Sequence, residues 1–237
     1  MINLSARGNT TLLKIMFGVL VLLVSFLCFK STNLMMASIQ FYGAQNYITQ
    51  WQVSGSEPEA EDIENAQQYA FKALTLHSDF ALYSDALSTV LQWKALQANN
   101  SELKNTALNE AEMFNLLSTK HRPSWPVTWA NLAYIKWLKG EFDEDFTRYI
   151  TNADSLGSTT PEVHLSLATI GLGMSRINIR DFLTHKALFR KHIVLGLTHP
   201  RSKKNIAIRI DNTQTKPMVC GWLMQAKSLL VNQLKCG

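Results

Sequence analysis

The chain has 237 residues, of which 46% are hydrophobic and 17% charged, and its formal net charge is +5. This composition excludes a disordered chain, and a mean hydropathy of -0.04 is too polar for a multi-span membrane protein. Three cysteines are too few for a disulfide-dense secreted scaffold or a four-cysteine zinc module. The composition therefore predicts a globular, mainly helical protein with room for one membrane span.

The first predicted element is a transmembrane helix over residues 12–29. Residues 15–29 carry no charge and rise ~22 Å as a helix, and snorkelling of Lys14 extends the apolar stretch to Leu12. A cleaved signal peptide is the alternative, but the sequence MMA at residues 35–37 has a small residue at only one of the two positions that cleavage requires. An uncleaved signal anchor is predicted.

Positive charge on the two sides of this helix predicts its orientation. Arg7, Lys14 and the amino terminus precede the span, whereas only Lys30 follows it closely and the next charge is Glu57. The positive-inside rule then leaves residues 1–11 in the cytoplasm. The remainder of the chain is expected outside, which is the periplasm in a Gram-negative cell with the anchor in the inner membrane.

Helical patterns dominate the rest of the chain, and alternating β-branched runs are almost absent. The predicted helices cover residues 34–52, 57–78, 80–98, 101–120, 125–139, 141–156, 161–175 and 218–235. Prolines suit the predicted first turns, and Gly140 and Gly157 mark predicted ends. We therefore expect a membrane-proximal helix and linker over 30–56, a helical-repeat domain over 57–178 and a basic helical region over 179–237.

A three-residue pattern recurs about every 40 residues. The matching sets are Ala66, Ala70 and Ala73; Ala107, Ala111 and Phe114; and Phe146, Ile150 and Ala153. Trp93 and Tyr134 also lie 41 residues apart, on the bulkier partner helices. This period predicts an all-α fold, in which the transmembrane helix precedes an α-solenoid of degenerate tetratricopeptide-like hairpins. An ordinary helical bundle is the alternative.

Residues 122–133 read RPSWPVTWANLA and continue with Lys136 and the pattern Gly140-Glu141-x-Asp143. Together with the single anchor, this segment resembles the VpsP-like polysaccharide biosynthesis proteins. These are small, membrane-anchored, helical-repeat proteins of marine and related gammaproteobacteria. The resemblance implies a role in exopolysaccharide assembly or export and partners among the proteins of that system, without assigning any chemistry.

Seven residues are candidate contacts for a partner or a glycan: Arg122, Trp125, Trp129, Arg190, Lys191, Lys203 and Lys204. The two tryptophans lie four residues apart on one predicted helical face. There they either wedge between hairpins or form a platform on which a sugar stacks. Arg122 either caps the preceding helix or binds an anion.

The four C-terminal cations belong to a strongly basic region. Residues 180–216 carry nine basic and two acidic side chains, a net of +7, whereas residues 57–155 carry eight basic and fifteen acidic, a net of -7. Such asymmetry steers anionic partners. The candidates are acidic polysaccharide, anionic phospholipid and the acidic half of another copy, and a solvated surface is the alternative. Nucleic acid is not expected outside the cytoplasm.

No catalytic motif is present in the sequence: it lacks G-x-S-x-G, Walker A, G-x-G-x-x-G and H-E-x-x-H patterns. The six histidines are predicted to be solvated at the surface. Acidic clusters at 57–64 and 143–145 are interpreted as helix-start charge, and Gly171 and Gly173 as positions of close packing. We therefore expect neither an enzyme nor a cofactor or metal site.

The predicted distance between Cys220 and Cys236 bears on whether they can form a disulfide. One helix over 218–235 would set them ~24 Å apart, too far for a disulfide. An intramolecular bridge would require a break near Gly221, and intermolecular pairing or free thiols are the alternatives.

The leading hypothesis is a non-enzymatic accessory or scaffold protein of exopolysaccharide biosynthesis, anchored in the inner membrane. The first alternative is a polysaccharide-binding module that uses Trp125 and the basic C-terminal region. The second is a glycan-modifying enzyme that uses the carboxylates between Glu141 and Asp145.

Overall fold

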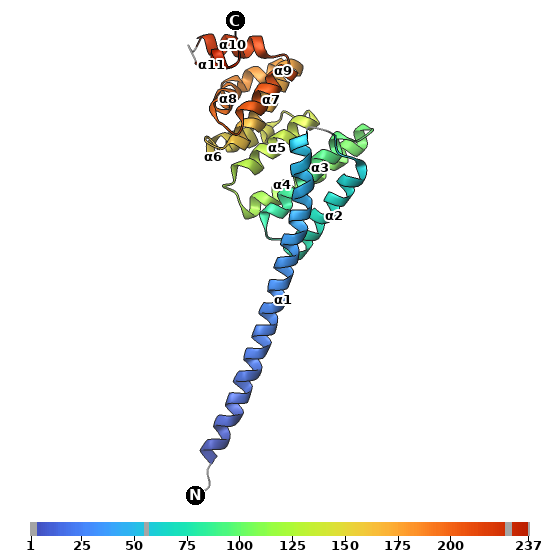
Figure 1. The fold of residues 1–237 in the computed structure, drawn as a ribbon, viewed down its shortest axis with the longest axis vertical. Helices are drawn as coiled ribbons and strands as arrows, with labels where there is room; N and C mark the ends of the chain where they lie inside the picture. The colour runs from blue at the N-terminus through green and yellow to red at the C-terminus, as the bar shows by residue number, and fades with distance from the viewer. Residues whose placement is uncertain (1–3, 55–56, 226–228, 237) are drawn as a thin grey trace. The chain divides into compact units, whose positions relative to one another are not determined.

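The computed structural model describes residues 4–54, 57–225 and 229–236, and these residues form helices α1 to α11 and the turns between them, without a strand (Figure 1). The predicted all-α class is confirmed. Parts of the expected cytoplasmic segment (1–3), the expected linker (55–56) and the C-terminal region (226–228 and 237) lie outside the described residues. The chain divides into two compact units, Met1–Val90 and Leu91–Gly237, and the division falls within α3 (Ala81–Leu96).

The first unit is built on α1 (Leu4–Ser54), one uninterrupted helix. Every side chain from residue 12 to residue 32 is exposed, over a rise of ~31 Å. The second half of α1 buries one face, formed by Ala37, Ala44, Ile48 and Trp51. It packs along α2 (Ala60–Leu76). The helix predicted over 34–52 is thus the C-terminal half of α1 and forms a hairpin with α2.

Local capping explains where the next helices begin and end. Asn100 accepts a hydrogen bond from the Leu103 backbone N–H at the start of α4 (Ser101–His121), and Asp143 does the same for Phe146 at the start of α6 (Glu144–Leu156). Proline occupies the first turn of α5 (Pro126–Lys139) and α7 (Pro161–Ile177). Gly140 ends α5 with φ +74°, a left-handed conformation that favours glycine.

Consecutive helices pair into hairpins, α5 with α6 and α7 with α8 (Ile179–Thr198), and α5 also packs on α7. The recurring small-residue positions are buried in α2, α4 and α6, apart from the partly buried Phe114. The same spacing returns in α8 as Phe189, Ile193 and Gly196, also buried, a copy that the sequence pattern missed. The boundary expected between residues 178 and 179 therefore falls between two helices of one hairpin.

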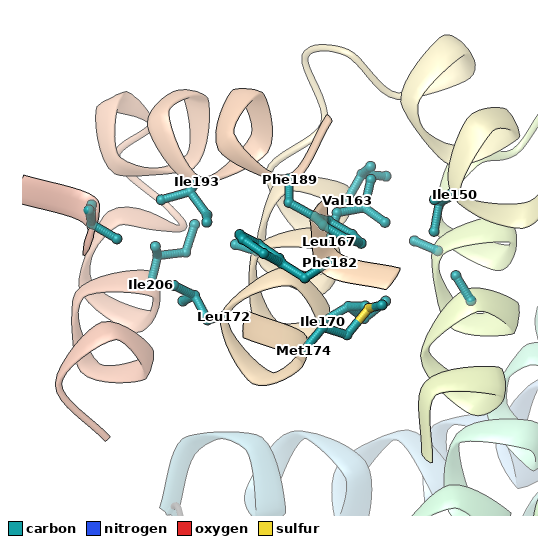
Figure 2. Packing of buried hydrophobic residues seen from close by; sticks show 14 of the residues in the cluster. Ile150, Val163, Leu167, Ile170, Leu172, Met174, Phe182, Phe189, Ile193 and Ile206 are labelled. Atoms are coloured by element: carbon teal, nitrogen blue, oxygen red, sulfur yellow. The ribbon is translucent and has the colours of Figure 1, made fainter. Parts of the chain in front are cut away.

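The core of the second unit includes side chains from α5, α6, α7 and α8, and Figure 2 shows the part around α7 and α8. The rings of Phe182 and Phe189 stack with centroids 6.2 Å apart and point into this core with Ile170 and Met174. A Cβ atom on Gly171 would lie 2.6 Å from the Phe189 side chain, so the two helices approach this closely only because position 171 is glycine. The predicted close packing at Gly171 is confirmed.

The predicted single helix over 218–235 is wrong. Helix α10 (Lys216–Gln225) follows α9 (Lys203–Asn212) and ends before α11 (Leu230–Gln233), and a disulfide joins Cys220 to Cys236 with Cα atoms 5.5 Å apart. Trp222 and Leu223 from α10 and Leu230 and Leu234 from the following segment bury their side chains in the same core cluster. A single straight helix could not bury both sets in one core. Gly221 lies inside α10, so the break does not occur there.

Candidate functional site

The exposed Trp125 and the partly buried Arg122 form a pair in the turn between α4 and α5. The Arg122 guanidinium carbon lies 4.3 Å from the Trp125 ring centroid, a cation–π contact, and Trp125 remains 43% exposed. The Arg122 backbone N–H donates to the Ser118 carbonyl at the end of α4. The Arg122 backbone thus closes the end of α4, and the capping role expected of its side chain stays a prediction.

Trp129 has different surroundings from Trp125, although the two were predicted to share a face. Its Nε1–H donates to the Pro123 carbonyl at 2.7 Å, and its ring lies 5.9 Å from that of Tyr149 on α6. Trp129 thus packs within the α5–α6 hairpin and fastens the preceding turn to it. Its indole N–H is already engaged by this turn and is not available to a glycan.

The four basic candidates divide into two pairs. Arg190 donates to the Trp222 carbonyl at 3.3 Å, and Lys191 forms an ion pair with Asp154. Lys203 and Lys204 are exposed in the first turn of α9. Arg190 and Lys191 line one surface of α8, and neither Arg122 nor Trp125 belongs to that lining. The seven predicted residues therefore do not converge on one site.

Arg190 and Lys191 do line a shallow, open depression formed by side chains of α8 alone, which we call the α8 groove. Its lining residues are Leu183, Thr184, Lys186, Ala187, Arg190, Lys191, Val194 and Leu195. Leu183 is 56% exposed, and Lys186 follows it by about one helical turn. A surface that combines exposed apolar side chains with cations is suited to a partner that carries both apolar and acidic groups.

His164 and His192 form a buried pair that sequence reasoning missed. Their Nδ1 atoms lie 2.9 Å apart, and His192 Nε2 lies 2.8 Å from an oxygen of Asp154, so the three side chains connect α7, α8 and α6. The prediction of surface histidines is wrong for these two, which are 3% and 0% exposed. Both histidines lie among the buried, mainly apolar positions of their helices, and His192 directly precedes Ile193 of the fourth small-residue repeat. Their place in this helical periodicity was the sequence signal that could have predicted their burial.

The surroundings of both imidazoles favour their neutral form. Burial, followed by the neighbouring His192, lowers the pKa of His164 from 6.5 to about 4. Burial also lowers the pKa of His192, although the hydrogen bond with Asp154 opposes this shift. The Asp154 pKa is lowered: burial alone would raise it, but the hydrogen bonds from Lys191 and His192 outweigh that effect. Asp154 therefore stays ionised between Lys191 and a neutral histidine.

The carboxylates near Gly140 are part of an ion-pair network centred on Lys136. The buried Nζ of Lys136 lies 2.6 Å from Glu141 and 2.8 Å from Asp143, and Lys139 pairs with Glu112 at 2.9 Å. Burial would raise the pKa values of Glu141 and Asp143, but hydrogen bonds from lysine lower them instead. A general acid in a glycosidase needs the opposite shift. This network joins α4, α5 and the start of α6, and Asp143 confirms the predicted helix-start role.

Metal-binding geometry is missing from the part of the chain that the structure describes: no group of three or more His, Cys, Asp or Glu side chains is arranged to hold an ion. In the His164–His192–Asp154 cluster, both Nδ1 atoms and His192 Nε2 have partners within the cluster. The two described clusters thus connect helices of the second unit.

No protein-family model and no curated protein matches this chain. Among solved structures it is similar to a thermophilic tetratricopeptide-repeat (TPR) protein of Thermus thermophilus, with a TM-score of 0.53 and 15% identity over 78% of this chain and 99% of that chain. At this identity the likeness shows the fold alone, which is a TPR-like helical repeat. Stacked repeats of this kind offer extended surfaces for protein–protein contact.

Proposed function

We propose that this protein is a membrane-anchored docking protein whose TPR-like hairpins bind other proteins outside the cytoplasm. Helix α1 carries this proposal. Its residues 12–29 expose apolar side chains on every side, while its second half packs into the first hairpin. One rigid element would therefore connect a membrane span directly to the repeats, without a flexible linker between them.

Two further observations support a location outside the cytoplasm. The positive charges precede the span, and the disulfide between Cys220 and Cys236 is typical of an oxidising compartment. In a Gram-negative cell this arrangement corresponds to the inner membrane, with residues 31–237 in the periplasm.

The resemblance of residues 122–143 to VpsP-like proteins supports a partner from an exopolysaccharide assembly or export system. Docking rather than catalysis is favoured because the carboxylates that resemble an acid–base pair are held ionised by Lys136. We propose the α8 groove as the docking surface, since the side chains of Lys186 and Arg190 complement acidic segments of a partner.

The test is photo-crosslinking in intact cells, with a photoreactive amino acid placed at Leu183 or Ala187 in the α8 groove. We expect adducts with envelope proteins of the polysaccharide system, and few adducts from the exposed position Leu103 on α4 as a matched control. Adducts with cytoplasmic proteins alone, or release of the protein from membranes by alkaline carbonate, would contradict the proposal.

A direct polysaccharide-binding role is the second candidate, favoured by the exposed Lys203 and Lys204 and by the exposed Trp125 ring. Affinity electrophoresis in gels that contain acidic polysaccharide tests it. The double variant Lys203→Glu, Lys204→Glu and the variant Trp125→Ala should each lose retardation. Equal mobility of the unaltered protein with and without polysaccharide removes this candidate.

A further inference from the structure

The second half of α1 exposes an uncharged surface beyond the membrane span. From Ser31 to Ser54 the sequence contains no charged residue. Helices that face water normally carry charged side chains on their exposed side. Here that side instead presents Met35, Ile39, Tyr42 and Val53, which are 57%, 53%, 64% and 82% exposed.

These residues form a regular seam, which we call the α1 stripe: Met35, Ile39, Tyr42, Asn46, Thr49 and Val53. Their spacing alternates between four and three residues, as the contact positions of a two-stranded coiled coil do. The face that packs on α2, marked by Ala37, Ala44 and Trp51, is shifted by two residues and so lies ~200° around the helix. Helix α2 therefore leaves the α1 stripe uncovered.

The same spacing continues backwards into the membrane span in unbroken phase, through Thr32, Cys28, Ser25, Val21 and Gly18. Small residues dominate this part of the seam, and small residues are enriched where membrane helices contact one another. A Cβ atom on Gly18 would meet nothing within 4 Å, so packing within the chain does not account for this glycine. One face of α1 thus has the features of a helix contact on both sides of the membrane surface.

We propose that the α1 stripe binds a second copy of this chain, so that two α1 helices pair in parallel from the membrane outwards. The inference rests on the proposed membrane anchoring, because two copies anchored in one orientation bring identical residues to the same height. Under two-fold symmetry each residue meets its own counterpart. Any charge in the seam would therefore face a like charge, which the uncharged sequence from 31 to 54 avoids.

Asn46 adds specificity to this pairing. It is exposed, and it occupies a contact position between Tyr42 and Thr49 in the otherwise mainly apolar α1 stripe. An asparagine at such a position pairs with its counterpart and selects a parallel, two-stranded register at some cost in stability. A second copy satisfies this requirement without any further assumption about the partner.

Cysteine crosslinking of the full-length protein in its membranes tests the pairing. In a Cys28→Ser background, Met35→Cys, Ile39→Cys and Tyr42→Cys place thiols on the α1 stripe, and Leu34→Cys is the matched control, exposed beside Met35 but off the stripe. With copper phenanthroline as the oxidant, the stripe variants should form disulfide-linked dimers at least ten times faster than Leu34→Cys. Equal rates at all four positions, no dimer, or adducts with a different protein only would overturn the proposal.

A charge in the seam gives an independent readout. Ile39→Glu should reduce dimer formation through Met35→Cys at least tenfold, whereas Leu34→Glu should not change it. Alkaline carbonate extraction of the same membranes separates the two proposals. Protein that stays in the membrane without crosslinking overturns the pairing alone, and protein that is washed out overturns the anchoring as well.

Discussion

At the scale of single residues, the paired imidazoles of His164 and His192 form a contact in the second unit that depends on pH. They join two helices at 2.9 Å between Nδ1 atoms, with Asp154 beyond them on a third. One imidazole must donate and the other accept, so the pair requires at least one neutral ring. The same contact that links α7 to α8 at neutral pH becomes repulsive if both rings acquire a proton.

We therefore predict that stability falls as the pH drops from 6.5 towards 4. The unfolded chain binds a proton at His164 near pH 6.5, whereas burial and the neighbouring His192 hold the folded pKa at about 4. The unfolded state thus binds more protons in this window, and the free energy of unfolding should decrease by about 2–3 kcal/mol across it. Chemical denaturation at a series of pH values measures the slope.

The matched variants are His164→Asn and His121→Gln. His164→Asn should flatten the slope between pH 6.5 and 4, while His121→Gln, at an exposed residue, should leave it unchanged. Lys191 and His199 also face the pair and lower the His164 pKa, so neither is a suitable control. A slope that is identical in all three proteins would show that the pair does not control the acid response.

At the scale of helices, glycines at helix crossings set the spacing of the repeats. Gly171 allows α7 to approach Phe189 on α8, and Gly173 lies against the Trp137 ring on α5, where a Cβ atom would come within 2.5 Å. Gly221, by contrast, lies inside α10, and a Cβ atom added there would meet nothing within 4 Å. The same residue type thus has opposite energetic effects at these positions.

Gly171→Ala should lower the free energy of unfolding by about 1–3 kcal/mol, because the new methyl group overpacks the contact with Phe189. Gly221→Ala should raise it by about 0.5–1 kcal/mol, because alanine has the higher helix propensity and meets no neighbour. Denaturant unfolding followed by circular dichroism compares the two. A similar effect of both substitutions would contradict the packing described for α7 and α8.

At the scale of the whole molecule, the disulfide and the apolar first helix are both consistent with the proposed export of residues 31–237. The bridge between Cys220 and Cys236 closes the C-terminal turn, and the exposed apolar helix precedes all of the repeats. If residues 31–237 are exported, the two thiols become oxidised, whereas cytoplasmic thiols stay reduced. The redox state of this pair therefore reports the compartment of the C-terminal unit.

In cells, Cys220 and Cys236 should resist alkylation unless a reductant is added, in a Cys28→Ser background that removes the remaining thiol. A chain without residues 1–30, which stays in the cytoplasm, should be alkylated at both positions. Alkylation of the full-length protein without reductant would place the C-terminal unit in a reducing compartment. Loss of the bridge in Cys220→Ser should cost about 3 kcal/mol, the value expected for closing a loop of this length.

The sequence by itself determined the helical class, most helix boundaries, the apolar first helix and the repeat spacing. These features depend on local chemistry: caps such as Asn100 and Asp143, prolines in first turns, Gly140 at a helix end, and the 3.6-residue periodicity of apolar positions. Only the tertiary structure decided that His164 meets His192, that Trp129 fastens a turn, and that Cys220 lies within disulfide distance of Cys236. These contacts join residues from different helices or turns, or they require two apolar segments to share one core. They therefore depend on how the helices pack against one another, which local sequence patterns do not specify.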